Sequence, residues 1–136
     1  MNLLGHLALS PPTNPQVMLG NLLGDCFKGR VENLPVAEGV RIGVRLHRGI
    51  DVYTDDHPAV LTTIAKLRTT HGRYASIVSD LLYDHLLASS WERWNAVPLR
   101  EFLDQRYVLL AGQRNLLDAE SARWLDRIIE HDIIYT

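Results

Sequence analysis

A run of apolar and acidic residues near the middle of the chain, SIVSDLLYDHLLA at residues 76–88, constrains the fold most strongly. Apolar residues recur on every turn, so the run predicts a buried helix, which we extend over residues 73–91. Asp80 and Asp84 lie four residues apart and would share one face of that helix, with His85 beside them. Ionised carboxylates in an apolar setting need a positive partner, and a divalent metal ion is one that would serve.

A second helix, predicted over residues 35–54, carries an apolar stripe that becomes polar along its length. Val40 and Val44 are followed in line by His47, Asp51 and Asp55. A solvated charged stripe would normally lie opposite the apolar residues rather than in line with them. We therefore expect these imidazole and carboxylate groups on the core side of the helix.

Three arginines form a neighbouring stripe on the same helix: Arg41, Arg45 and Arg48. A solvated face, with the arginine stems lying along the surface, accounts for this stripe. A site for phosphate or for an acidic partner is the alternative, and the spacing alone leaves both open.

The remaining chain also reads as helical. Periodicity predicts helices over residues 16–27, 59–68, 99–113 and 119–131. Asn14 and Asp118 are the expected N-caps of the first and the last of these, and no stretch alternates as a half-buried strand would. With 136 residues, of which 46% are hydrophobic, the chain predicts one all-α domain, a compact helical array over residues 1–136.

Composition limits the partners and the cellular location that we expect. A net charge of -2 leaves no global basic field of the kind that binds nucleic acid. The single Cys26 excludes an internal disulfide, and the apolar residues 1–10 are too few to span a bilayer. We expect a cytoplasmic protein with no nucleic-acid or membrane partner.

Nine imidazole and carboxylate residues stand out in four separate segments: His6, Asp25, His47, Asp51, Asp55, His57, Asp80, Asp84 and His85. Each has an ordinary structural explanation, such as a helix pair for His47 and Asp51. Together, on faces that must meet in the core, they predict a metal site. His and Asp ligands without cysteine suit Mn, Fe, Mg or Zn, and such a site favours hydrolysis of a phosphate ester.

Four segments resemble one known family. They are MNLLGHL at residues 1–7, LGNLLGDCFKG at 19–29, LHRGIDVYTD at 46–55 with His57-Pro58, and DLLYDH at 80–85 with Trp91. Their order and spacing resemble the acyl carrier protein phosphodiesterase family, strongly over residues 1–95 and more weakly beyond. The resemblance implies an HD-domain-like helical fold and a Mn-dependent hydrolase linked to fatty acid biosynthesis. Such enzymes release 4′-phosphopantetheine from holo acyl carrier protein.

The resemblance also implies roles for single residues. The side chains expected nearest the metal are Asp25, His47, Asp84 and His85. Asp80 or Asp51 is expected to serve as the base or as an outer ligand of the metal. Arg48 is expected to hold a phosphate oxygen. Residues expected to steer the acidic carrier protein are Arg41 and Arg45. Further candidates are His6, Asp55 and His57.

Members of that family usually continue with further helices, which this chain lacks. Residues 133–136 would then form an exposed apolar end, so we expect either a truncated form or a homodimer through the exposed C-terminal helix. Two other functions stay open. One is a non-catalytic helical module that binds an acidic partner through its arginines, and the other is a phosphohydrolase acting on another small phosphate ester.

Overall fold

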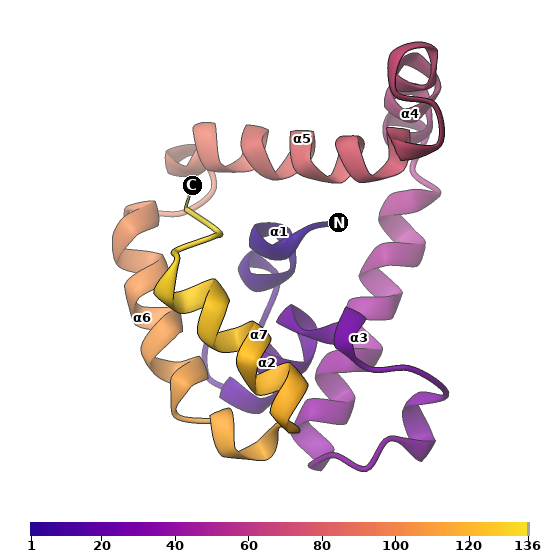
Figure 1. The fold of residues 1–136 in the computed structure, drawn as a ribbon. Helices are drawn as coiled ribbons and strands as arrows, with labels where there is room; N and C mark the ends of the chain where they lie inside the picture. The colour runs from indigo at the N-terminus through magenta and orange to yellow at the C-terminus, as the bar shows by residue number, and fades with distance from the viewer. Residues whose placement is uncertain (136) are drawn as a thin grey trace.

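The computed structural model describes residues 1–135, which fold into α-helices joined by loops and short 3-10 helices (Figure 1). The α-helices are α1 (Leu3–Ala8), α2 (Pro15–Leu22), α3 (Glu38–Asp55), α4 (Pro58–His71), α5 (Ala75–Ser89), α6 (Leu99–Ala111) and α7 (Ala119–Glu130). The 3-10 helices are η1 (Gly24–Cys26), η2 (Val31–Asn33), η3 (Gly72–Tyr74), η4 (Trp91–Arg93) and η5 (Arg114–Leu116). Residues 1–135 contain no strand, so the all-α prediction is confirmed. No helix within this range is long and apolar enough to cross a membrane.

Helices α1 and α2 form the centre of the array. In Figure 1, α1 lies in the middle, with α5 above it, α3 to one side, α6 to the other and α7 in front. Five of the inner helices contribute fully buried side chains to one core, among them Leu7, Met18, Val44, Leu103 and Leu125. The sequence predicted no helix at residues 3–8, yet α1 lies in the middle of the array and contacts both α2 and α5.

Helices α2 and α3 pack backbone to backbone at two glycines. A Cβ atom on Gly20 would lie 2.1 Å from the carbonyl oxygen of Val40, and one on Gly43 would lie 2.2 Å from that of Val17. Only residues without a Cβ allow two helix backbones this close. The crossing places the end of α2 against the middle of α3.

The helix predicted over residues 16–27 is shorter than expected. Asn14 caps it as predicted, accepting from Val17 N at 3.3 Å, but α2 stops at Leu22 and Asp25 lies in η1. The reason is steric, because η1 passes directly over the His47 ring. A Cβ on Gly24 would lie 2.2 Å from the ring Cγ of His47.

The helix predicted from residue 35 begins later, at Glu38. Arg41 reaches back from its first turns and donates to the carbonyl oxygen of Leu34 at 2.9 Å. That bond holds Leu34 in an extended conformation. Such a conformation is the preferred one for a residue that precedes a proline, here Pro35.

The prediction that the central helix is buried is wrong. In α5, Ile77 is 58% exposed, Leu81 54% and Leu86 50%. The helix lies along one edge of the array and packs only one side against α1, while its N-terminal end contacts α4. Its continuous apolar character therefore leaves an apolar outer surface.

The expectation of an exposed apolar C-terminal end is wrong for Ile133 and Ile134, whereas Tyr135 is 49% exposed and Thr136 lies outside the described residues. Ile133 and Ile134 are partly buried against the core. Asp132 holds this segment in place, because it pairs with Arg100 and accepts a hydrogen bond of 2.9 Å from Tyr107 Oη. The sequence argument for a homodimer rested on that exposure.

We expect Gly43→Ala to lower the free energy of unfolding by about 1–3 kcal/mol, because the new Cβ must push α2 and α3 apart. Gly49, on the same helix, has no atom within 4 Å of an added Cβ. Gly49→Ala is therefore the matched control and should stabilise by about 0.5–1 kcal/mol. Urea unfolding followed by circular dichroism measures both, and equal effects would contradict the proposed crossing.

The pKa of Asp132 lies below its usual value, mainly because Arg100 donates hydrogen bonds to it. The ionised carboxylate therefore stabilises the fold above the unfolded-state pKa of about 3.9, and this stabilisation is lost as the pH falls through the lower folded-state pKa. We expect the free energy of unfolding to decline less steeply below about pH 4 in Asp132→Asn than in the parent protein. Asparagine also tolerates the positive φ of 49° at this residue. Identical slopes in acid unfolding titrations would show that Asp132 does not contribute.

Candidate metal centre

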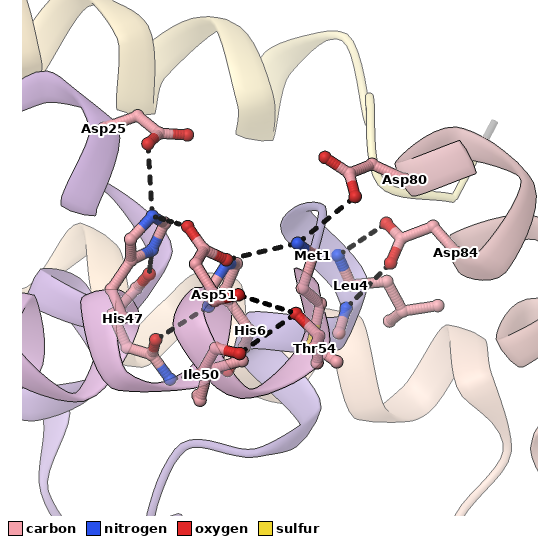
Figure 2. A network of polar contacts seen from close by, with 12 residues as sticks. Met1, Leu4, His6, Asp25, His47, Ile50, Asp51, Thr54, Asp80 and Asp84 are labelled. Atoms are coloured by element: carbon pink, nitrogen blue, oxygen red, sulfur yellow. Dashed lines mark hydrogen bonds and ion pairs between the residues drawn. The ribbon is translucent and has the colours of Figure 1, made fainter. Parts of the chain in front are cut away.

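Four side chains converge where α1, η1 and α3 meet (Figure 2). His6 comes from α1, Asp25 from η1, and His47 and Asp51 from successive turns of α3. One ligand atom from each of His6, His47 and Asp51 lies within 4.8 Å of the others, and residues 1–135 hold no other group of three that could bind an ion. Asp25 joins them through its Oδ1, which lies 3.2 Å from His47 Nε2.

Asn21 fixes the tautomer of both imidazoles. Its side-chain nitrogen donates to the carbonyl oxygen of His6 at 2.8 Å and to Ser10 Oγ at 2.9 Å. Its Oδ1 is thus left to accept from His6 Nδ1, 3.0 Å away. The backbone oxygen of Asn21 accepts from His47 Nδ1 at 2.7 Å. With Nδ1 protonated in both rings, each neutral imidazole carries its lone pair on Nε2.

Both Nε2 atoms face carboxylate oxygens. His47 Nε2 lies 3.2 Å from Asp25 Oδ1 and 3.2 Å from Asp51 Oδ2, and His6 Nε2 lies 3.1 Å from Asp51 Oδ1. His6 is 1% exposed, and its Nε2 has no hydrogen bond of acceptable geometry with the described residues. Lone pairs that face each other repel, so each contact requires a proton or a metal ion between them.

The two imidazoles also stack on each other. Their ring centroids are 3.8 Å apart, and their planes are inclined by 13°. Protonating both rings would bring two positive charges into contact in a buried setting, which is unfavourable. One divalent cation would instead satisfy both Nε2 lone pairs and the Asp51 carboxylate, and this donor set fits Mn, Fe or Zn.

Asp51 is the electrostatic centre of the group. Burial would raise its pKa, but the contacts of its carboxylate with the His47 and His6 imidazoles and with the Met1 amino group hold that pKa well below its usual range. Burial alone would lower the pKa of His47. The contacts with Asp51 and the Asn21 carbonyl outweigh the effect of burial, so the pKa of His47 is raised. The ionised Asp51 therefore attracts a positive charge to this point.

A cationic group already lies at the open edge of the centre. The amino group of Met1 is 3.1 Å from Asp51 Oδ1 and 3.3 Å from Asp80 Oδ1. Asp80 thus reaches the centre from α5, across the helix array (Figure 2).

Two further candidates from the sequence lie beyond this edge. Asp55 is exposed one turn after Asp51, and partial burial together with nearby carboxylates raises the pKa of Asp55. His57 begins α4, where its Nδ1 accepts from Ala59 N at 3.1 Å. His57 is therefore an N-cap of α4 and is not part of the group of three.

Asp84 and His85, expected nearest the metal, lie outside the group of three. The two carboxylate oxygens of Asp84 accept from Leu4 N and Gly5 N, both at 2.9 Å. Asp84 therefore caps the first turn of α1 from the neighbouring helix α5. Burial raises its pKa, and these two hydrogen bonds offset only part of that rise. His85 is exposed and lies beside Asp84 in a pocket between α5 and the C-terminal segment.

Two of the three arginines on α3 bind backbone oxygens. Arg48 donates to the loop that follows η1, at 2.7 and 3.2 Å, and so fastens the segment next to Asp25. Arg41 donates to the loop before α3 and pairs with Glu38 at 2.8 Å. Arg45 is exposed and makes no hydrogen bond or ion pair with the described residues, so its guanidinium group is available to a partner.

Sequence reasoning missed Asn21 and gave His6 too small a role. Asn21 is fully buried within an apolar helix, and a polar amide in such a run is the signal that could have identified it. The position of the Met1 amino group leaves no signal in the sequence.

Comparison with known proteins places the chain in one protein family. The chain matches the family model described as Acyl carrier protein phosphodiesterase over residues 1–136. No solved structure matches it, so the HD-domain-like arrangement stays a prediction.

Curated relatives carry the same description. One from Photorhabdus laumondii is 37% identical over 93 residues, which cover 68% of this chain and 46% of the relative. One from Serratia proteamaculans is 38% identical over 96 residues, covering 68% and 47%. One from Escherichia coli is 36% identical over 104 residues, covering 76% and 53%. The chain thus spans about half the length of the curated relatives it matches.

We expect Asp84→Asn to weaken α1 rather than the candidate metal centre. An amide N–H would face a backbone N–H of Leu4 or Gly5, so the free energy of unfolding should fall by about 1–3 kcal/mol. Asp51→Asn should instead lower the affinity for Mn²⁺ at least about tenfold. Urea unfolding and calorimetric titration with Mn²⁺ measure the two effects. A larger loss of Mn²⁺ affinity in Asp84→Asn than in Asp51→Asn would contradict this assignment.

Proposed function

The chain belongs to the acyl carrier protein phosphodiesterase family, and from that membership we propose that it is a metal-dependent hydrolase that releases 4′-phosphopantetheine from holo acyl carrier protein. The observation that carries the metal dependence is the buried His6 Nε2, which faces Asp51 Oδ1 at 3.1 Å with no hydrogen bond of acceptable geometry. A buried polar atom in this state is one that a bound ion would satisfy.

His6, His47 and Asp51 would hold the ion, with Asp25 as a further ligand. We expect manganese, as the resemblance of the motifs implies, and the nitrogen and oxygen donors suit it. A bound divalent ion supplies a water of lowered pKa and neutralises charge on the phosphate oxygens. Asn21 and Asp51 hold the two imidazoles so that neither has to rotate when the ion binds.

The proposed reaction is attack of water on the phosphodiester phosphorus. The bond between phosphorus and the serine oxygen of the carrier protein breaks, the serine oxygen takes up a proton, and the arm leaves as a phosphate monoester. We assign Asp80 as the base that accepts the proton of the attacking water. It faces the centre from α5, has a partly exposed side chain and lies outside the group of three ligands.

The carrier protein is an acidic partner, and Arg45 is the α3 arginine left available to it. Its exposed guanidinium group would steer the carrier protein toward the neighbouring centre. A cytoplasmic location is part of the same proposal.

The test compares two histidine variants. We expect His47→Gln to lose bound Mn²⁺ and to slow conversion of holo to apo carrier protein at least about 100-fold, because a ligand is removed. His71→Gln, at the exposed end of α4, is the matched control and should keep both. Elemental analysis gives the metal content, and mass spectrometry of the carrier protein gives the turnover.

Each part of the proposal can fail separately. Full turnover after treatment with a chelator would refute the metal dependence. Stoichiometric Mn²⁺ without conversion of holo carrier protein would refute the substrate and favour another small phosphate ester.

A further inference from the structure

A pocket of about 560 Å³ opens between η1 and α7, directly beside the candidate metal centre. Asp25 belongs to both. Its side chain is 90% exposed and lines the pocket, while its Oδ1 lies 3.2 Å from His47 Nε2. The pocket volume falls within the range of small-molecule sites. Anything bound there would therefore lie next to the group that holds the ion.

Three cationic side chains line this pocket: Lys28, Arg123 and Arg127. All three are exposed, and none forms an ion pair or a side-chain hydrogen bond with residues 1–135. The other arginines near the site differ, because Arg48 and Arg41 bind backbone oxygens.

Two of the three acidic residues of the pocket have partners within the protein. Asp118 caps α7 by accepting from Ser121 N at 2.8 Å, and Asp25 faces His47. Glu120 is exposed on the first turn of α7. On the same helix, the ring of Trp124 lies under Arg127, whose guanidinium carbon is 6.0 Å from the ring centroid. The pocket thus combines available cations with an aromatic surface.

We propose that this pocket binds the phosphate-bearing pantetheine arm, with Lys28, Arg123 and Arg127 contacting phosphate oxygens and Trp124 packing against the arm. The identity of the arm rests on the proposed function. Arg48, which the sequence suggested for the phosphate, has its guanidinium on backbone oxygens and is replaced in this role by the three pocket cations.

Charge development in the reaction supports this location. A phosphodiester carries one negative charge, and the monoester that leaves with the arm carries between about 1.5 and 2 at neutral pH. Cations placed beside Asp25 would stabilise that added charge as it forms. They would also offset the repulsion between the arriving phosphate and the carboxylates of Asp25 and Asp51.

The experiment measures binding of 4′-phosphopantetheine to metal-free protein by calorimetric titration in about 0.15 M salt. The pocket variant is Lys28→Gln/Arg127→Gln. The control is Arg30→Gln/Arg68→Gln, which removes the same charge from exposed residues that do not line the pocket. We expect the dissociation constant to rise about tenfold or more in the pocket variant and less than about twofold in the control. Equal dissociation constants in the two variants would overturn the inference.

Turnover separates this inference from the proposed function. If the parent protein binds 4′-phosphopantetheine and the pocket variant does not, but no carrier protein is converted, the pocket stands and the proposed reaction fails. If carrier protein is converted and the pocket variant keeps both its affinity for the arm and its KM, the reaction stands and the pocket assignment fails. Circular dichroism of both variants confirms that the comparison is between folded proteins.

Discussion

The candidate metal centre depends on the close approach of α2 and α3 at Gly20 and Gly43. Because no Cβ lies between the two backbones, the end of α2 reaches the turn of α3 that carries His47. The backbone oxygen of Asn21 can then accept from His47 Nδ1 at 2.7 Å, and its side chain can extend to His6 on the other side. The centre thus depends on this one helix contact, and α1 and η1 bring His6 and Asp25 to the position that the contact defines.

Spacing within one helix predicted which side of α3 faces inward as far as Asp51, but Asp55, expected on the same side, is exposed. Val40, Val44 and His47 are buried and Asp51 is half-buried, as a single helical stripe requires. Spacing could not show which neighbour each acid on α5 would meet. Asp80 faces the Met1 amino group, whereas Asp84, one turn further, faces the N–H groups that begin α1. That difference arises from α1, a helix of 6 residues that is too short for periodicity to reveal.

Apolar periodicity also overstated burial in α5. A helix that is apolar on all sides predicts a core position, but the core here is filled by α1 and α2. Only one side of α5 finds a partner, and residues such as Leu81 stay exposed. Helix formation was therefore predictable from local sequence, while the position of each helix, inside or at the edge, depended on which segments occupy the core.

The side chain of Asn21 determines which ring nitrogen of His6 carries the lone pair. A carboxamide has two unlike ends, and here the nitrogen end is bound to His6 O and Ser10 Oγ while the oxygen end receives the His6 Nδ1 proton. A carboxylate at this position could also accept from His6 Nδ1, but it has no N–H to donate to His6 O and Ser10 Oγ. The side-chain oxygen of Asn21 thus leaves the lone pair of the His6 ring on Nε2, and the backbone oxygen of the same residue does this for the His47 ring. A single asparagine orients both imidazoles toward the same point in space.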